Sequence, residues 1–248
     1  MKKLKAWIEA SRLRTLPLAL SSIGMGSFLA VFHNTFDTKI FMLCLVTTLL
    51  LQILSNLAND YGDSQHGADS TGREGPKRQV QLGVISKKEM LTAIALISLL
   101  TLSSGLWLLT LSFGEINVTF VIFLLLGLTA IGAAVKYTMG KSPYGYHGFG
   151  DLFVLIFFGF VGVAGSYVLQ AKQISPSVIL PALGFGLLST GVLNLNNIRD
   201  IQSDKAAGKY SIPVRIGRKN AVFYHWCLLA GAFVAVIIFT IRYFENSY

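Results

Sequence analysis

The sequence predicts an all-α protein, a polytopic bundle of transmembrane helices. Of its 248 residues, 53% are hydrophobic and only 13% are charged, whereas a soluble domain carries about 25% charged residues. The apolar residues gather in blocks of about 20, the number that a helix needs to cross a hydrocarbon core ~30 Å thick. Together these observations exclude a disordered chain, a coiled coil and an ordinary water-soluble enzyme.

Seven apolar blocks are predicted to be helices, because the strands of a membrane barrel would alternate apolar and polar residues. The first follows a basic tail and contains the small residues GMGS at 24–27. The fourth and fifth contain GLTAIGAA at 127–134 and GFVGVAG at 159–165, where small residues allow close helix packing in lipid. The interiors of the blocks carry no Asp, Glu, Lys or Arg, and His225 lies near the start of the seventh. The predicted spans are 15–33, 40–60, 90–112, 117–136, 151–170, 176–196 and 219–241.

The basic residues orient the predicted bundle. Of the 21 Lys and Arg residues, 18 lie in the N-terminal tail and in the loops at 61–90, 136–148 and 197–219, all on one side of the membrane. By the positive-inside rule this side is cytoplasmic. We therefore expect an integral protein of the cytoplasmic membrane with its N-terminus inside. The net charge of +9 then reflects topology and does not indicate a nucleic-acid partner.

Two groups of carboxylate and amide side chains lie where apolar helices reach this cytoplasmic face. An offset of 137 residues aligns the asparagine and the first aspartate of one group with those of the other, so the chain contains a pseudo-repeat. An even number of membrane crossings separates the groups, which places both on the same side. The groups are Asn59, Asp63 and Asp69, and Asn196, Asp200 and Asp204.

The spacing within these groups indicates a metal site. Side chains four residues apart lie on one face of a helix, so Asn196, Asp200 and Asp204 form one stripe of oxygen atoms. Hard oxygen ligands on opposing helices suit Mg²⁺, which completes its shell with water and with the phosphates of a substrate. The alternative is that these residues are solvated helix ends or caps, a common role of Asn and Asp. Two matching groups on one side favour the metal site.

Basic residues near the two groups are candidates for binding a diphosphate that the metal balances only in part. The segment 137–141 adds the phenol of Tyr137 and the ammonium group of Lys141 on the same side. The alternative is that these residues only reflect the positive-inside bias and the interfacial preference of tyrosine. The basic candidates are Arg73, Lys77 and Arg78 after the first group, and Lys205, Lys209, Arg215 and Arg218 after the second.

The chain resembles the UbiA superfamily of intramembrane prenyltransferases over nearly its whole length. The matching pieces are NDYGDSQHGAD at 59–69, YTMGK at 137–141 and NNIRDIQSDKAAGKYSIPVRIG at 196–217. Within the superfamily it is most similar to the branch that prenylates 1,4-dihydroxy-2-naphthoate in menaquinone synthesis. That similarity rests on the DxxxGxD form of the first motif, RTLP at 14–17, GPKR at 75–78 and YGYHGFGDLFVLIFFGFVGVAGSYVLQ at 144–170.

The resemblance implies transfer of a polyprenyl group from an allylic diphosphate to 1,4-dihydroxy-2-naphthoate, with loss of CO₂, to give a demethylmenaquinone. It implies Mg²⁺ as cofactor and the inner membrane of a bacterium as location. The implied partners are the two substrates and the lipid bilayer, without nucleic acid or an obligate protein partner. The implied residues are Asp63, Asp69, Asp200 and Asp204 as metal ligands; Asn59, Lys77, Arg78, Asn196 and Lys205 at the diphosphate; Asp63, Asp200, Tyr137 and Lys141 in catalysis; and Arg14 at the acceptor.

Two departures from the superfamily pattern bear on these expectations. The ubiquinone branch reads NxxxDxxxD, whereas position 67 here is Gly and the next acid is Asp69, which favours the naphthoate branch. The superfamily typically has nine transmembrane helices, so the resemblance implies that 1–248 is a single prenyltransferase domain lacking the last two. The remaining alternatives are another acceptor (hydroxybenzoate, homogentisate, haem or a chlorophyll precursor) and a cation-coupled transporter, whose ion sites would lie near the bilayer midplane.

Overall fold

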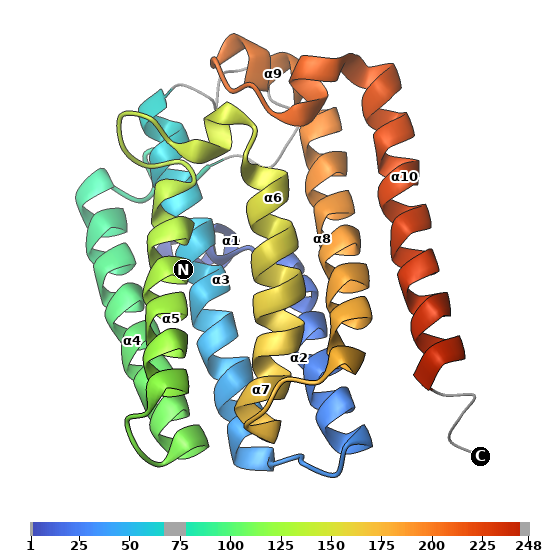
Figure 1. Ribbon diagram of the computed structural model, residues 1–248. Coiled ribbons are helices and arrows are strands. Elements are labelled where there is room, and N and C mark those ends of the chain that lie inside the picture. Colours follow the sequence, from blue (N-terminus) through green and yellow to red (C-terminus); the bar gives the residue numbers. More distant parts are fainter. Residues whose placement is uncertain (1, 67–77, 244–248) are drawn as a thin grey trace.

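The computed structural model describes residues 2–66 and 78–243, which form long helices side by side and contain no strand (Figure 1). Seven helices or unbroken helical runs are long and apolar enough to cross a membrane. The predicted fold class and the predicted number of spans are thus confirmed. The α-helices are α1 (Lys2–Ser11), α2 (Leu16–Phe32), α3 (Thr38–His66), α4 (Lys87–Phe113), α5 (Val118–Lys136), α6 (Gly150–Val154), α7 (Ser166–Ala171), α8 (Ile179–Arg199), α9 (Ile201–Ala206) and α10 (Ile212–Tyr243).

Local sequence signals fix the ends of several helices. Ser86 and Glu89 form a reciprocal capping box at the start of α4, which satisfies amide groups that have no partner within the helix. Gly114 ends that helix with φ +74°, a conformation that glycine adopts without steric cost. Asn117 caps α5 by accepting a hydrogen bond from the amide of Phe120 at 2.9 Å. These short-range interactions set the helix lengths that the apolar blocks predict only approximately.

The fifth span contains a π-helical segment, Leu155–Gly165, between α6 and α7. A Cβ atom on Gly159 would lie 2.5 Å from the carbonyl oxygen of Ala182 and 2.9 Å from Cα of Gly186. The two backbones therefore approach so closely that only glycine fits at the crossing. The small-residue run in this block predicts close packing correctly, but it carries no signal for the wider helical turn.

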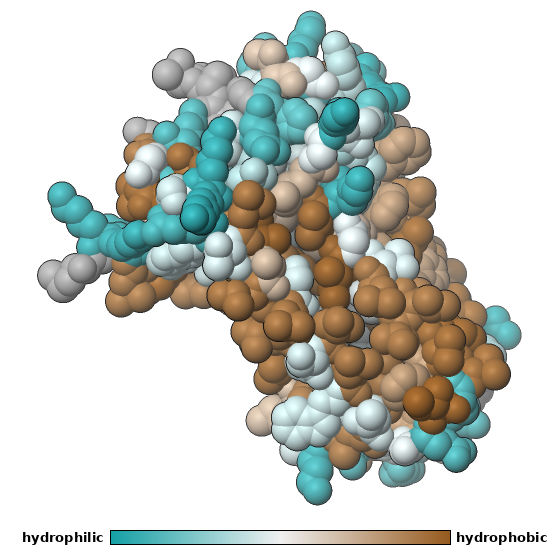
Figure 2. All heavy atoms as spheres, turned by 90° about the vertical axis from the view of Figure 1, so that its left-hand side faces the viewer, coloured by the Kyte–Doolittle hydropathy of each residue, from teal (hydrophilic) through white to brown (hydrophobic). Residues whose placement is uncertain are grey.

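The surface separates into an apolar body and a hydrophilic end. Figure 2 shows a broad apolar band below a region where hydrophilic side chains gather, with a smaller hydrophilic group at the opposite end. Such a band is expected of a protein whose helices face lipid. The larger hydrophilic region includes α9 and the ends of α3 and α8 that carry the two aspartate groups.

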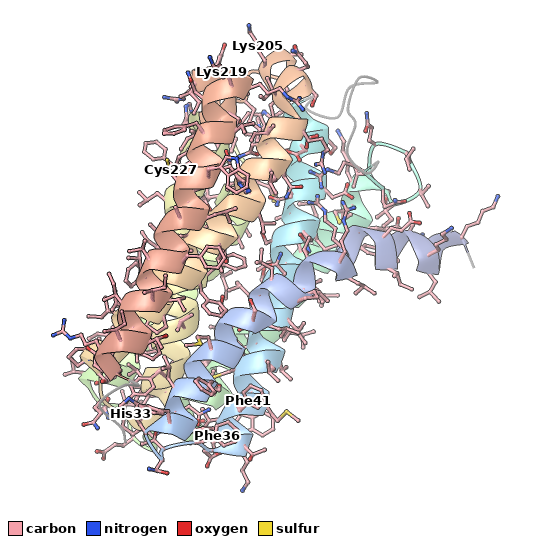
Figure 3. The ribbon with its side chains drawn as sticks, turned by 90° about the vertical axis from the view of Figure 1, so that its right-hand side faces the viewer. His33, Phe36, Phe41, Lys205, Lys219 and Cys227 are labelled. Carbon is pink, nitrogen blue, oxygen red and sulfur yellow. The ribbon has the colours of Figure 1, made fainter. Side chains whose placement is uncertain are left out.

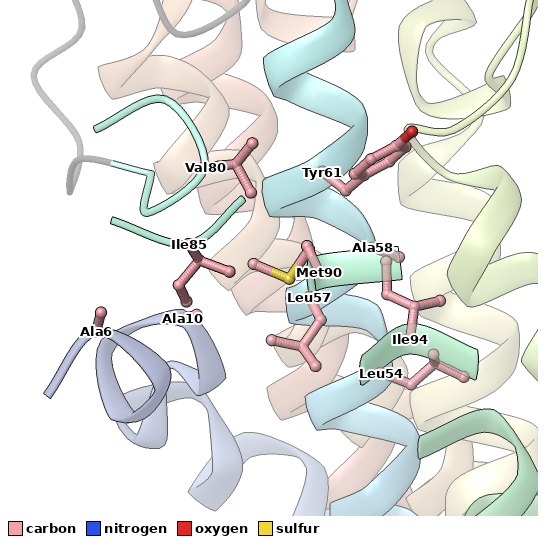
Figure 4. Close-up of a cluster of buried hydrophobic side chains, with 10 residues drawn as sticks. All are labelled: Ala6, Ala10, Leu54, Leu57, Ala58, Tyr61, Val80, Ile85, Met90 and Ile94. Carbon is pink, nitrogen blue, oxygen red and sulfur yellow. The ribbon is translucent and has the colours of Figure 1, made fainter. Parts of the chain in front are cut away.

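The basic N-terminal segment is a helix, whereas its sequence predicts only a tail. Helix α1 leaves the bundle sideways before α2 turns into it (Figure 3). Ala6 and Ala10 are buried against Ile85 and neighbouring side chains of α3 and α4 (Figure 4). This apolar cluster fixes α1 against the bundle near the aspartate end.

Candidate active site

Three aspartates are buried at one end of the bundle, where the two motifs meet. Asp63 lies near the end of α3, Asp200 joins α8 to α9, and Asp204 lies within α9. Their exposed fractions are 3%, 7% and 5%. The charges of Asp200 and Asp63 both act on Asp204, so the two motifs face each other closely enough to interact.

Asp63 is held by a buried ion pair. Nη2 of Arg78 donates to Oδ2 of Asp63 at 2.5 Å, and the hydroxyl of Tyr146 donates to Oδ1 at 3.2 Å. Arg78 is itself only 6% exposed. Because a buried charge is stable only with a partner of opposite sign and further hydrogen bonds, the two side chains depend on each other.

The second motif keeps its four-residue spacing although the helix is interrupted. Asp200 has φ −92° and ψ +10°, which ends α8 and begins α9. Its amide still donates to the carbonyl of Asn196 at 3.1 Å, and the amide of Asp204 donates to the carbonyl of Asp200 at 2.8 Å. Arg199 donates two hydrogen bonds to the Asp200 carboxylate, at 2.8 and 2.7 Å.

Lys209 lies inside the site, between the two motifs. Gly208 has φ +70°, and this turn lets the amide of Lys209 donate to the carbonyl of Asp204 at 2.8 Å. The ammonium group then lies 3.3 Å from Oδ2 of Asp204. Burial alone would lower the pKa of Lys209, but Tyr137, Asp204 and Asp63 raise it. Burial raises the pKa of Tyr137, an effect that nearby Lys209 opposes.

Asn59 is oriented by the segment that follows α5. The hydroxyl of Thr138 is 3.2 Å from Oδ1 of Asn59 and 3.1 Å from the carbonyl oxygen of Ala58, and it can donate to either. Thr138 is 1% exposed, and a Cβ atom on Gly62 would lie 2.6 Å from its backbone carbonyl. Gly62 therefore lets the segment dock against α3 at the level of the first motif.

An apolar cavity of about 370 Å³ opens below the aspartates. Asn59, Asn196 and Tyr137 line its upper part, and Cys44 and Leu169, which belong to a packed apolar cluster, line its floor. Along α3, the distance from Asn59 to Cys44 is ~22 Å at 1.5 Å per residue. None of the described lining residues is Asp, Glu, Lys or Arg.

The other residues predicted from sequence lie in several different environments. Lys141 and Lys205 are exposed, as is Arg14, whose neighbour Thr15 lines the cavity. The side chain of Asn196 is also exposed and donates to its own helix, at the carbonyl of Val192. Asp69 and Lys77, with Arg73, lie outside the described residues.

The sequence pattern offers Lys209 only as one of seven basic candidates near the motifs, and it does not indicate Tyr146. Only the turn at Gly208 distinguishes Lys209 from exposed Lys205. The sequence pattern also does not indicate the structural role of Asp60. This residue is buried and accepts hydrogen bonds from the backbone amides of Gln79 and Val80 at 3.0 and 3.2 Å. Asp60 thereby anchors the segment that carries Arg78.

The donor atoms suit a hard divalent cation that shares its shell with a substrate. Among the described residues, no group donates a hydrogen bond to the buried Oδ2 of Asp204, although the ammonium group of Lys209 lies 3.3 Å away. A cation bound there would share this oxygen with Lys209. Within residues 2–66 and 78–243, however, no three Asp, Glu, His or Cys side chains converge closely enough to enclose a metal ion. Mg²⁺ commonly binds through one or two carboxylates together with substrate phosphates and water, and this arrangement fits that mode.

Comparison with known proteins identifies relatives over almost the whole chain. The 1,4-dihydroxy-2-naphthoate octaprenyltransferase of Escherichia coli (strain K12) is 47% identical over 241 residues, which cover 97% of this chain and 78% of that protein. The protein of the same name from Mycobacterium leprae is 33% identical, covering 96% and 78%. A solved structure from a study of digeranylgeranylglyceryl phosphate synthase has a TM-score of 0.59 at 20% identity, covering 99% of this chain and 79% of that one, and shows the shared fold.

The sequence pattern of the UbiA prenyltransferase family matches residues 19–248. The match includes both aspartate motifs and six complete predicted spans. With relatives of this identity and coverage, the chain belongs to the UbiA prenyltransferase family.

Proposed function

We propose that this protein transfers a polyprenyl group from an allylic diphosphate to 1,4-dihydroxy-2-naphthoate, with Mg²⁺ as cofactor and loss of CO₂. The observation that carries the proposal is the meeting of two aspartate motifs above an apolar cavity within a membrane-spanning bundle. The names of the relatives at 47% and 33% identity support the choice of acceptor.

The aspartate end receives the diphosphate. Asp63, Asp200 and Asp204, with Asp69, would hold the metal ion, and the chemistry it would supply is neutralisation of charge on the departing pyrophosphate. Lys209 and Arg78 lie among these carboxylates and stabilise the same oxygens by charge-assisted hydrogen bonds. Asn59 and Asn196 border the cavity just below, where the first carbon of the prenyl group would lie. Exposed Lys141 and Lys205 attract the substrate from outside, and Lys77 also contributes to diphosphate binding.

The cavity holds the apolar tail and shields the reacting carbon from water. Its lining is mostly aliphatic and aromatic, and its floor is closed by a packed cluster. Excluding water protects an electron-deficient allylic carbon from hydrolysis. The tail and the surrounding lipid are equally apolar, which explains why the reaction takes place within a membrane protein.

The acceptor attacks from the polar end of the cavity. The allylic C–O bond breaks and pyrophosphate leaves with its electron pair, while the ring carbon that bears the carboxylate forms the new C–C bond. Loss of CO₂ then returns an electron pair to the ring and restores aromaticity. Lys141 or Arg14 binds the acceptor carboxylate before it is lost, and Tyr137, whose pKa is raised by burial, takes part through its hydroxyl. The aspartate end faces the cytoplasm of a bacterial cell, from which the soluble acceptor enters.

A prenyl-transfer assay tests the proposal. Membranes containing the chain are supplied with dihydroxynaphthoate, a long-chain prenyl diphosphate and Mg²⁺, and the demethylmenaquinone product is detected by mass. We expect product that disappears with EDTA and is absent from membranes carrying Asp200→Asn. Product from hydroxybenzoate but not from dihydroxynaphthoate would contradict the acceptor assignment. Undiminished product after removal of divalent cations would contradict the cofactor. If no acceptor reacts, the assay is repeated with a chain extended by two helices.

A further inference from the structure

Helix α1 has three distinct faces. Ala6 and Ala10 are buried against the bundle. A second face carries Leu4 and Ile8, which are 69% and 47% exposed, with Trp7 half-buried beside them. An exposed apolar face on a helix that leaves the bundle sideways (Figure 3) is unfavourable in water and favourable at the boundary between headgroups and acyl chains.

The third face of α1 carries Lys2 and Lys5, which are exposed, and Lys5 pairs with Glu9. On the side that faces α4, Lys3 pairs with Glu89, which also accepts hydrogen bonds from the amide and hydroxyl of Ser86. Lys88 is exposed beside Glu89. With two lysines against one glutamate, the surface between the two helices has an excess of positive charge.

A groove runs between α1 and α4 along this basic surface. It is lined by Trp7, Lys88, Glu89, Thr92, Ala93 and Leu96. Its lower part is apolar, with Ala93 and Leu96 successive on one side of α4, and its upper part carries the ammonium group of Lys88. This order of polarity matches that of a phospholipid, whose acyl chain lies below a charged headgroup.

We propose that α1 lies in the membrane interface and that the α1–α4 groove binds an anionic phospholipid of the bilayer. Lys88 and Lys3 bind the anionic headgroup, Trp7 lies at the level of the glycerol backbone, and an acyl chain packs against Ala93 and Leu96. Charge complementarity selects the anionic lipid, because clusters of lysine beside an amphipathic helix attract anionic headgroups.

The bound lipid would also support the aspartate end through a short path. Glu9 of α1 accepts a hydrogen bond from Nε2 of Gln79 at 2.9 Å. The backbone amide of Gln79 in turn donates to the carboxylate of Asp60. The residue before Gln79 is Arg78, which pairs with Asp63. Holding α1 in the interface therefore holds the segment that supplies Arg78 to the site.

The test uses the full chain with Trp7 as its only tryptophan. Trp107 and Trp226 are each 64% exposed, so Trp107→Phe and Trp226→Phe leave the core intact. The protein is placed in nanodiscs of phosphatidylcholine and phosphatidylglycerol in which either one lipid or the other carries brominated acyl chains. We expect brominated phosphatidylglycerol to quench Trp7 at least twofold more strongly than brominated phosphatidylcholine at equal mole fraction.

Charge variants complete the test. Lys3→Gln with Lys88→Gln should remove the preference for phosphatidylglycerol, and Lys205→Gln, on α9 away from α1 (Figure 3), should leave it unchanged. Equal quenching by the two lipids in the parent protein would overturn the lipid site, and no quenching by either would overturn the interfacial position of α1. Loss of the preference with Lys205→Gln would also contradict the proposed site. The readout needs no prenyl transfer, so it does not depend on the proposed activity.

Discussion

The ammonium group of Lys209 lies 3.3 Å from Oδ2 of Asp204 and is close enough to Asp63 for the two charges to interact. A basic side chain thus joins the two aspartate motifs from within. It comes from the turn after the second motif, and it is much less exposed than Lys205, five residues after Asp200.

Replacing Lys209 should weaken diphosphate binding. We expect Lys209→Met to lower kcat/KM for the prenyl diphosphate on the order of 100-fold, because a buried charge-assisted donor to the leaving group is lost. Lys209→Arg should recover part of the activity. Lys205→Met removes the same charge from an exposed position and should change the value little. Inhibition by inorganic pyrophosphate provides a second measurement, and an equal inhibition constant in Lys209→Met and parent protein would contradict the role.

Breaking the buried pair of Asp63 and Arg78 should affect stability and activity separately. Asp63→Ala should abolish turnover and lower the free energy of unfolding by ~3 kcal/mol, because it removes the carboxylate that pairs with the buried charge of Arg78. Adding Arg78→Met should recover much of the stability but none of the activity. Thermal unfolding in detergent and the prenyl-transfer assay give the two readouts. A double variant as unstable as Asp63→Ala would show that the buried charge of Arg78 is not the cause of the lost stability.

The hydroxyl of Thr138 should act as a positioning group for Asn59. We expect Thr138→Val to reduce activity roughly 10-fold, as is typical when the partner of a ligand-orienting residue is removed, while leaving thermal stability nearly unchanged. Thr138→Ser keeps the hydroxyl and should restore activity. The Mg²⁺ concentration for half-maximal rate should rise in the valine variant only. If Thr138→Ser and Thr138→Val had equal activity, a positioning role of the Thr138 hydroxyl would be excluded.

Narrowing the cavity should discriminate against long tails. Gly127 lines the cavity, and a Cβ atom added there would meet no other atom within 4 Å. Gly132 on the same helix is equally open but lies outside the lining. We expect Gly127→Leu to raise KM for a long-chain prenyl diphosphate roughly 10-fold and to affect geranyl diphosphate less. Gly132→Leu is the matched control and should behave as the parent. Equal effects of the two substitutions would argue against tail binding in this cavity.

The sequence predicts the fold well because the bilayer imposes one dominant pattern. Apolar blocks of span length and the bias of Lys and Arg are sufficient to predict seven helices, and they require no knowledge of tertiary contacts. The helical state of residues 2–11 is not predicted, since its apolar face is short and interrupted by lysines. The π-helical segment 155–165 is not predicted either, because its run of apolar and small residues does not distinguish a wide helical turn from an α-helical one.

The site is predictable in part, for a related reason. Spacing along one helix predicts which aspartates can face each other, and the structure brings Asp63, Asp200 and Asp204 together. Spacing does not show which residues the turns bring into the site, so Lys209 is only one of several basic candidates and Tyr146 is not predicted. Tyr146 reaches Asp63 from a short 3₁₀ turn, and Lys209 reaches Asp204 because of one positive φ angle. These contacts depend on loop geometry, which periodicity does not encode.

The pairing of charges at the aspartate end affects how substrate is captured. Because each buried site aspartate of the described chain has its own basic partner, the aspartates add little net negative charge, and the remaining lysines and arginines leave this end positive. A field of one sign steers the association of a ligand of opposite charge. The anionic diphosphate head would therefore be drawn to this end at a rate that falls as ionic strength rises. The pairs are Asp63 with Arg78, Asp200 with Arg199, and Asp204 with Lys209.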